Sequence, residues 1–347
     1  MKSDSIGERK NRHFFYFTNH DYPDTNLFDC IKLFNNPLCD IDLDNVDTSL
    51  NFLTYSLSFP LMIASITGGT SEVGSFNEDI SQAASDFRLP LSCGSIRIAL
   101  ENPNLTSAFK LKKSGIPFYA ANIGAATLSS IDLSALDSFL HDIEADILFI
   151  HFNRLQELAQ AGGDRCFDKT LTTLKTASEK LHTPIILKET GWGFGPQSWL
   201  RALELGACAL DTGGSGGTDF LSIELDYNSD LIETMAPFSN WGVPTPACLL
   251  MNKNKSLPLI AGGGIRNGLD VFKSLVIGAS LASIAGTAVK AWIDGGLAGL
   301  LNHITEIINQ FRMAMVLTGS NSVSDICNLP FSIGEPLSGF LNVTNQN

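Results

Sequence analysis

The sequence is short of positive charge and has no run of five basic residues. Its 347 residues include 23 Lys or Arg and 36 Asp or Glu, which gives a formal net charge of −13 at pH 7. No run of basic residues offers a local exception, so the chain as a whole repels polyanions. We therefore expect no nucleic-acid partner, and an anionic ligand would have to be held by a few local cations.

Long apolar segments are also missing. The uncharged stretch 274–289 has only 16 residues and is interrupted by glycine and serine. The N-terminus has no apolar segment of the kind found in secretion signals. The seven cysteines include no CxxC pair, which argues against both a disulfide framework and a zinc site. These absences predict a cytoplasmic protein without a membrane span.

The sequence is rich in short apolar runs that end on glycine or on a polar residue. Eight of them are candidate parallel strands: residues 59–65, 89–95, 116–122, 146–153, 183–189, 207–213, 257–263 and 282–286. Helical patterns separate the runs, one with a capping box at Ser75 and Glu78 and one that closes at Gly206. Strand and helix in alternation predict the α/β class and a (β/α)8 TIM barrel.

The barrel pattern predicts one domain over 1–347, made of an N-terminal extension (1–58), the barrel core (59–290), and C-terminal helices with a tail (291–347). The sixth and seventh strands are some 45 residues apart, more than one connecting helix needs, so we expect an elaborated loop or a helical insertion over the ligand-binding face. The extension carries a basic cluster: Arg9, Lys10, Arg12 and His13.

A dense polar cluster, HFNRLQE at 151–157, follows the fourth predicted strand. In a barrel of this type, ligand-binding side chains belong at the carboxyl ends of the strands. Strand alternation places His151 and Asn153 on one face, and Gln156 and Glu157 follow directly. The cluster favours a ligand site, although Gln156 and Glu157 would also suit a helix start, where an acidic residue is favourable.

Glycine-rich turns follow the last two predicted strands, in AGGGIRNG and IAGTAV. Each leads into a helix, so backbone N–H groups are available to a phosphate, and Arg266 would add a bidentate contact. Either run alone can be a simple turn, but together they favour a phosphate site. The runs SITGGT and TGGSGGT would let a flat ring lie against the backbone, or reflect loop geometry only.

Lys188 ends the fifth predicted strand, where a cation is costly to bury without an anionic partner. A reduced flavin would be such a partner. An ion pair with Glu189 or Asp211 is the alternative.

A set of segments, in this order along the chain, resembles the type 2 isopentenyl-diphosphate isomerases, which are FMN-dependent barrel enzymes. The matching segments are ERKNRH (8–13), ASITGGT (64–70), CGSIR (93–97), ANIGA (121–125), HFNRLQE (151–157), KETGWG (188–193), DTGGSGGTDF (211–220), WGVPT (241–245), GGGIRNGLDVFKSLVIGA (262–279) and IAG (284–286). The ordered set is more specific than any one segment.

The resemblance implies a residue set for each ligand. FMN would be held by Ala64, Ser65, Ile66, Thr67, Ser95, Asn122, Lys188, Thr218, Gly263, Gly264, Ile265, Arg266, Ala285 and Gly286. An alkenyl diphosphate would contact Arg9, Lys10, His13, Ser95, Arg97, His151, Asn153 and Gln156. Gln156 would be the catalytic residue beside the allylic carbons, and Glu157 would help to hold Mg2+.

The implied activity is the interconversion of isopentenyl diphosphate and dimethylallyl diphosphate, a step of isoprenoid biosynthesis. Reduced FMN would act as acid and base, NADPH would only prime the flavin, and the protein would be a homo-oligomer, a tetramer or an octamer. An FMN-dependent oxidoreductase of the hydroxy-acid or dihydroorotate type is the alternative, with His151 as the only histidine at a strand end. A third possibility is an FMN-binding protein without catalysis.

The sequence departs from the family pattern at four places. Arg12 stands where the N-terminal motif usually has Glu, Ile66 replaces Met, and Ile96 replaces Gln. An Arg that usually follows the IE pair of the sixth-strand loop is missing near Asp226 and Tyr227. These departures concern the shape of the substrate pocket and leave the implied flavin and metal positions intact.

Overall fold

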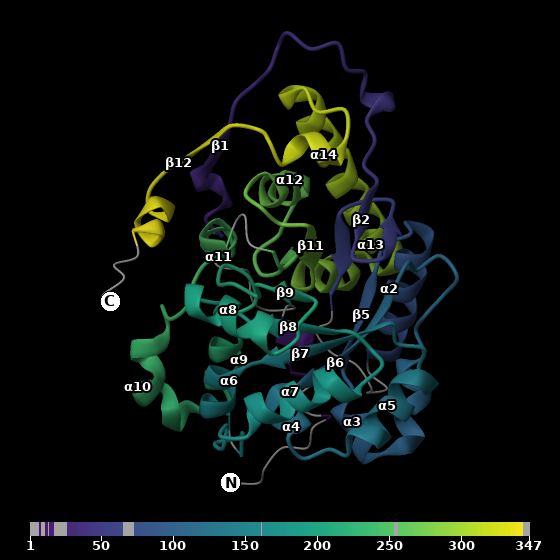
Figure 1. The fold of residues 1–347 in the computed structure, drawn as a ribbon, viewed down its shortest axis with the longest axis vertical. Coiled ribbons are helices and arrows are strands. Elements are labelled where there is room, and N and C mark those ends of the chain that lie inside the picture. The colour runs from purple at the N-terminus through teal and green to yellow at the C-terminus, as the bar shows by residue number, and fades with distance from the viewer. Residues whose placement is uncertain are drawn as a thin grey trace.

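A closed barrel of eight parallel strands forms the centre of the protein (Figure 1). The computed structural model describes residues 7, 11–12, 14–16, 26–64, 73–160, 162–252 and 256–342. The barrel strands are β4 (Leu61–Ile63), β5 (Leu91–Ser95), β6 (Tyr119–Gly124), β7 (Ile147–Phe152), β8 (Ile185–Glu189), β9 (Ala209–Asp211), β10 (Leu259–Ala261) and β11 (Leu281–Ile284). Each strand overlaps one predicted run, so the predicted TIM barrel is confirmed.

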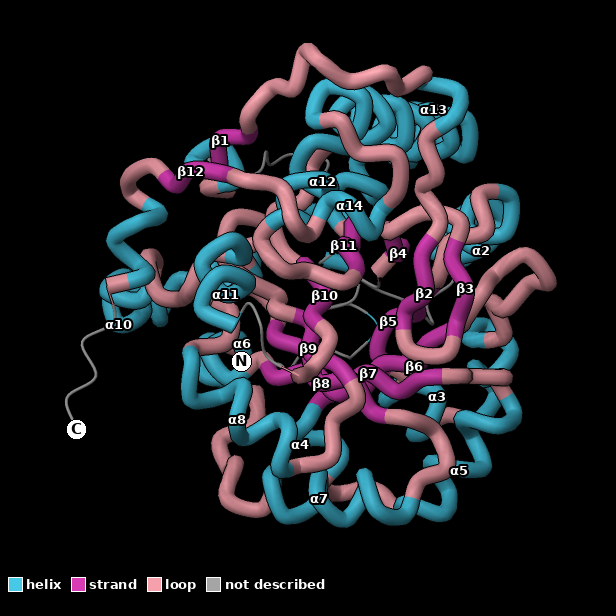
Figure 2. Tube along the Cα trace, turned by 45° about the horizontal axis from the view of Figure 1, so that its top comes forward, coloured by secondary structure: helices cyan, strands magenta, loops and turns pink. Residues whose placement is uncertain are grey.

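Helices surround the strands, as Figure 2 shows. They are α2 (Gly74–Asp86), α3 (Arg97–Glu101), α4 (Ala125–Leu128), α5 (Leu133–Asp142), α6 (Arg154–Ala159), α7 (Thr170–Lys180), α8 (Pro196–Glu204), α12 (Gly268–Val276), α13 (Gly286–Thr318) and α14 (Val323–Ile326). Helix α8 ends as predicted, because Gly206 adopts a left-handed conformation that suits a helix end. Non-helical geometry at Gly295 and Gly296 divides α13 into two helical parts.

The predicted capping box at Ser75 and Glu78 was wrong. Helix α2 begins at Gly74, and Val73 caps it without a side-chain hydrogen bond. Ser75 therefore lies inside the first turn, past the position from which its hydroxyl could cap the helix. A capping box does occur at α14, where Ser322 and Asp325 bond reciprocally.

A short hairpin packs into the amino-terminal end of the barrel. It consists of β2 (Leu50–Phe52) and β3 (Tyr55–Leu57), which pair antiparallel. Phe52 stacks on Phe118 with ring centroids 6.0 Å apart, and Tyr55 contacts the same ring at 5.0 Å. Phe118 directly precedes β6, so the hairpin lies opposite the carboxyl ends of the strands. Part of the extension at 1–58 thus completes the barrel core.

The long connection between β9 and β10 is a helical insertion, as expected. It contains α9 (Phe220–Tyr227), η5 (Ser229–Leu231), α10 (Ile232–Met235), η6 (Ala236–Phe238) and α11 (Thr245–Asn252). Helix α9 packs against α6, where Leu221 and Ala159 share a small buried cluster. This packing brings the start of α6, and with it the HFNRLQE cluster, against the insertion.

Two short strands that are far apart in the sequence meet outside the barrel. Strand β1 (Ile31–Leu33) pairs antiparallel with β12 (Phe331–Ile333), and Figures 1 and 2 show the two side by side. The remaining short elements are η1 (Phe28–Cys30), η2 (Leu43–Asn45), η4 (Pro103–Phe109) and η7 (Leu337–Leu341).

All seven cysteines are free. None of the helices in the described part of the chain combines the length and the apolar character that crossing a bilayer requires.

Candidate functional site

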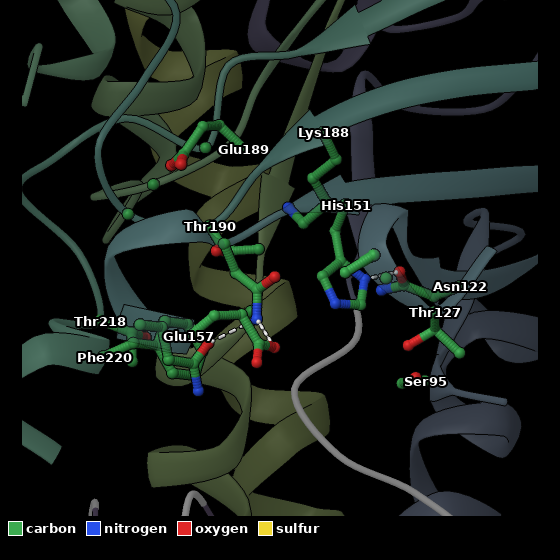
Figure 3. A pocket seen from close by; sticks show the side chains of 18 of the residues that line it. Ser95, Asn122, Thr127, His151, Glu157, Lys188, Glu189, Thr190, Thr218 and Phe220 are labelled. Atoms are coloured by element: carbon green, nitrogen blue, oxygen red, sulfur yellow. Dashed lines mark hydrogen bonds between the residues drawn. The ribbon is translucent and has the colours of Figure 1, made fainter. Parts of the chain in front are cut away.

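A cavity opens at the carboxyl ends of the barrel strands, and it brings together most of the described candidate residues (Figure 3). Those that line it are Ser95, Arg97, Asn122, His151, Asn153, Gln156, Glu157, Lys188, Thr218, Gly263 and Ala285. They come from seven different strand ends and the segments that follow them. Candidates chosen for a flavin and candidates chosen for a diphosphate thus share one cavity.

Five other described candidates do not line this cavity: Ala64, Gly264, Ile265, Arg266 and Gly286. Ala64 and Ile265 are buried, and the guanidinium of Arg266 donates to the carbonyl of Gly216 at 3.2 Å. Six candidates lie outside the described residues: Arg9, Lys10, His13, Ser65, Ile66 and Thr67.

The HFNRLQE cluster forms a connected hydrogen-bond network at the start of α6. Asn153 Nδ2 donates to Gln156 Oε1 at 3.2 Å and to Glu157 Oε1 at 2.9 Å. The second oxygen of Glu157 accepts from the backbone N–H of Asp164 at 2.8 Å. Asn153 precedes the helix but its side chain does not cap it. The network therefore orients the polar groups of Gln156 and Glu157 at the cavity wall.

Glu224 is a site residue that sequence reasoning missed. It lies on α9, its side chain is buried, and its Oε1 accepts from Gln156 Nε2 at 2.9 Å. The available signal was an acidic residue within the apolar run FLSIEL, since a carboxylate is rarely buried unless it has a partner. The hydrogen bond fixes which end of the Gln156 amide faces the insertion.

His151 is held by its neighbour on β6. Its Nδ1 lies 2.7 Å from Asn122 Oδ1, and Figure 3 shows the amide beside the imidazole ring. Because an amide oxygen only accepts, Nδ1 carries the proton in this arrangement. The other ring nitrogen lies near Gly124, where a side chain would crowd it.

Lys188 pairs with Asp211, one of the two partners considered from the sequence. The two residues stand opposite each other on β8 and β9, and Lys188 Nζ lies 2.8 Å from Asp211 Oδ2. Asp211 is fully buried, and its other oxygen accepts from the backbone N–H of Gly213. Lys188 lines the cavity as well, so one cation contacts both the buried carboxylate and the space where a ligand would lie.

Glu189 follows Lys188 and does not take part in that ion pair. Its Oε2 accepts from the backbone N–H groups of Trp192 at 2.6 Å and Gly193 at 3.2 Å. Burial raises the pKa of Glu189 to about 8, and these N–H donors with the Lys188 cation only partly oppose the effect. At neutral pH the carboxyl group is therefore mostly uncharged, although Glu189 also borders the cavity.

The two glycine-rich turns that are predicted to bind a phosphate follow β10 and β11. Gly263 and Gly264 have φ angles of 94° and 82°, a left-handed conformation that residues with a Cβ rarely adopt. In the first turn of α13, the buried hydroxyl of Thr287 has no hydrogen-bond partner within the described structure. A buried hydroxyl without a partner is unfavourable by about 1–3 kcal/mol, so this oxygen suits a polar ligand at the helix N-terminus.

Within the described residues, no group of three or more His, Cys, Asp or Glu side chains is arranged to hold a metal ion. Glu157 would thus offer a metal ion one carboxylate at the cavity wall. This donor set suits Mg2+ only where phosphate oxygens and water complete the coordination.

Comparisons with known proteins bear on this cavity. Residues 241–329, which include β10, β11 and the turns after them, match the family of FMN-dependent dehydrogenases. The fold resembles a mandelate oxidase variant with 2-hydroxy-phenylacetamide (TM-score 0.63, 15% identity, 95% of this chain and 98% of that one). It also resembles a flavocytochrome b2 variant with sulfite bound (TM-score 0.65, 15% identity, 91% and 81%). At these identities the structural likeness concerns the fold alone.

Similarity in sequence extends over nearly the whole chain. The isopentenyl-diphosphate delta-isomerase of Picrophilus torridus is 33% identical over 97% of this chain and 99% of its own. That of Thermoplasma volcanium is 33% identical over 92% and 94%, and that of Borreliella afzelii 29% identical over 99% and 98%. This extent of identity over nearly the full length of both chains shows that the chain belongs to the type 2 isopentenyl-diphosphate delta-isomerase family.

Proposed function

We propose that this protein interconverts isopentenyl diphosphate and dimethylallyl diphosphate, in isoprenoid biosynthesis, with FMN and Mg2+ bound. The observation that carries the proposal is the shared cavity, in which Lys188 lies among the flavin candidates and Gln156 and Glu157 lie among the substrate candidates. Fold likeness alone would not separate this activity from other flavoenzymes, so the site must carry the argument.

FMN would lie with its phosphate at the turns after β10 and β11 and its ring near Lys188 and Asn122. The unsatisfied hydroxyl of Thr287 and the left-handed backbone at Gly263 fit a phosphate there. The Lys188 cation fits a ring that carries negative charge when reduced. The cofactor would supply an acid and a base matched to an unactivated alkene, which ordinary side-chain acids are not.

The diphosphate would be held on the opposite side of the cavity. Arg97 lines this side and uses its Nε for an ion pair with Glu101 at 2.9 Å, while the rest of the guanidinium can bind phosphate oxygens. Asn153 and Ser95 add polar groups. Glu157 would bridge to the diphosphate through Mg2+, since each of its oxygens accepts one described hydrogen bond and can still coordinate.

Gln156 would orient the alkene or relay a proton close to the reacting carbons. Its amide is fixed at both ends, because Asn153 donates to its oxygen and its nitrogen donates to Glu224. A side chain fixed in this way loses little conformational freedom when a substrate binds, which favours precise orientation.

The proposal also includes NADPH as the priming reductant, a cytoplasmic homo-oligomer (tetramer or octamer), and a single domain with the boundaries given above. The resemblance to the family supports these features.

The decisive test is stoichiometry. Purified protein reconstituted with FMN and Mg2+ and reduced once should convert many molecules of isopentenyl diphosphate per reducing equivalent, measured by product analysis under anaerobic conditions. An oxidoreductase of the hydroxy-acid or dihydroorotate type would consume one donor in each cycle. An FMN-binding protein without catalysis would give neither result.

Lys188 and Asp211 allow the role of the cation to be separated from that of the ion pair. We expect Lys188→Ala to slow isomerisation, keep part of its FMN and lower the reduction potential of the bound flavin by roughly 30 mV or more, since 30 mV corresponds to about 1.4 kcal/mol for two electrons. Asp211→Asn also breaks the pair but keeps the cation, so its potential should not fall. Equal decreases of the flavin reduction potential in both variants would mean that Lys188 acts only as the structural partner of Asp211.

Gln156 and Glu157 should respond differently to Mg2+. Glu157→Gln keeps the shape but removes an anionic ligand, so its activity should drop about 10-fold or more and recover in part at high Mg2+. Gln156→Ala should lower turnover by a similar factor without such recovery. Glu204→Gln, on the outer helix α8, is the matched control. If high Mg2+ restored the activity of the Gln156 variant alone, the roles assigned to the two residues would be reversed. If both variants had normal turnover, the two side chains would serve only the start of helix α6.

Glu189 should make stability depend on pH. Its pKa of about 8 lies above that of an unfolded glutamate, so the folded state retains a proton that the unfolded state has lost. The free energy of unfolding should therefore decrease from about pH 5 to about pH 8, by at most about 1.4 kcal/mol per pH unit for this group. Urea unfolding of wild type and Glu189→Gln across this range measures the difference. Parallel curves would contradict the raised pKa.

A further inference from the structure

Asn26, in the N-terminal extension, is buried where the extension meets the turns that follow β9 and β10. A Cβ at Gly216 would lie 2.9 Å from the Cα of Asn26, and a Cβ at Gly264 would lie 3.0 Å from the Cβ of Asn26. The two turns also meet each other, since the Cβ at Gly264 would lie 3.0 Å from the carbonyl oxygen of Gly216. Asn26 is therefore packed against both turns.

The side-chain amide of Asn26 connects the turn after β10 to helix α12. Its Nδ2 donates to the carbonyl of Gly264 at 2.6 Å and to Asp270 Oδ2 at 3.0 Å, which uses both N–H groups of the amide. The same carboxylate oxygen accepts from the backbone N–H of Arg266 at 3.0 Å. One amide and one carboxylate thus hold two backbone groups of the glycine-rich turn.

Asp270 depends on these donors because it is buried. Burial raises the pKa of Asp270, while the backbone N–H of Arg266 and the amide of Asn26 oppose this rise. A buried carboxylate is unfavourable unless hydrogen bonds stabilise it. The interaction of Asn26 with Asp270 is therefore part of what keeps α12 and the turn in one arrangement.

The hydrogen bond to Gly264 also sets the direction of the next backbone N–H. The peptide bond that follows Gly264 is trans, so its C=O and the N–H of Ile265 point in opposite directions, and that N–H is turned away from Asn26. Within the described part of the chain, the N–H groups of Gly263, Gly264 and Ile265 donate to no other group. Successive N–H groups in a turn of this kind can bind an anion.

We propose that Asn26 is a positioning residue for FMN, which holds the turn after β10 in the conformation that receives the flavin phosphate. The inference rests on the proposed function, which places that phosphate at the turns after β10 and β11. Asn26 does not line the cavity, and it acts through the carbonyl of Gly264 and through Asp270. The N-terminal extension thus contributes to cofactor binding from outside the barrel.

The extension keeps its place without this amide. Phe28 is fully buried, and its carbonyl accepts from Lys273 Nζ at 3.0 Å. Asn26→Ala also retains the Cβ that packs near Gly264 and removes only the amide. The substitution should therefore loosen the turn and leave the rest of the fold intact.

The test compares FMN with riboflavin, which has the same ring system and no phosphate. Each flavin is titrated into the full-length protein freed of flavin, and binding is followed by the quenching of flavin fluorescence. Asn26→Ala should weaken FMN binding by about 10-fold and riboflavin binding by less than about twofold, because the turn would contact only the phosphate.

Asn51→Ala is the matched control. It removes another amide of the same extension, one that accepts from Ser56 in the hairpin, and it should leave both affinities unchanged. Equal weakening of FMN and riboflavin in Asn26→Ala, or loss of both, would mean that Asn26 serves the fold in general, and would overturn the proposal.

A double-mutant cycle tests the network. Asp270→Ala removes the acceptor that Asn26 and Arg266 share, so it should weaken FMN binding at least as much as Asn26→Ala. In the double variant the factor by which binding weakens should be smaller than the product of the two single factors, because the groups belong to one network. A factor equal to that product would show independent action and would contradict the proposal.

Hydrogen exchange of residues 262–267 in the flavin-free protein separates this inference from the proposed function. Exchange should be faster in Asn26→Ala than in wild type and unchanged in Asn51→Ala. If the wild type prefers FMN over riboflavin, and Asn26→Ala loses this preference, the inference stands even if the protein does not isomerise its expected substrate. If the variant keeps the preference and its exchange is unchanged, the inference fails whatever the activity.

Discussion

The close approach of backbone segments at the carboxyl ends of β8, β9 and β10 is the constraint on which the cavity depends. A Cβ at Gly213 would collide with the carbonyl of Glu189, one at Gly262 with the carboxylate of Asp211, and one at Gly263 with the carbonyl of Gly214. The glycines thus let three strand ends meet without side chains between them. This packing encloses Asp211, and the buried carboxylate in turn requires the Lys188 cation that borders the cavity.

A second layer of organisation comes from the insertion. Helix α9 packs on α6 through apolar residues, and the same contact aligns Glu224 with Gln156. Its outer end meets Arg12 of the N-terminal segment. A connection that looks like an oversized loop in the sequence therefore joins the polar network of the fourth barrel strand to a distant part of the chain, and it brings acidic charge to both contacts.

The features of the fold and the site that depend on local sequence patterns could be predicted from the sequence. A parallel barrel strand is apolar on both faces, so each of the eight runs was visible, as was the polar cluster after Phe152. The partner of Lys188 stayed open, because pairing with Asp211 depends on the register of two strands. Glu224 was missed because nothing within α9 reveals that its carboxylate faces Gln156. The N-terminal cap of α2 was misplaced by two residues, at Ser75 in place of Val73, a distance at which helix ends are poorly defined by local sequence.

The pairing of β1 with β12 has a consequence for how the chain is made. Its partners, Ile31 with Ile333 and Leu33 with Phe331, are about 300 positions apart, so the loop they close contains the entire barrel. Lys273 reinforces the same region when it donates to the carbonyl of Phe28. On the ribosome, β1 emerges before the barrel strands, but its partner β12 is synthesised after them. The barrel strands are therefore made before β1 can pair with β12. Until then, the backbone N–H and C=O groups of β1 are unpaired and exposed.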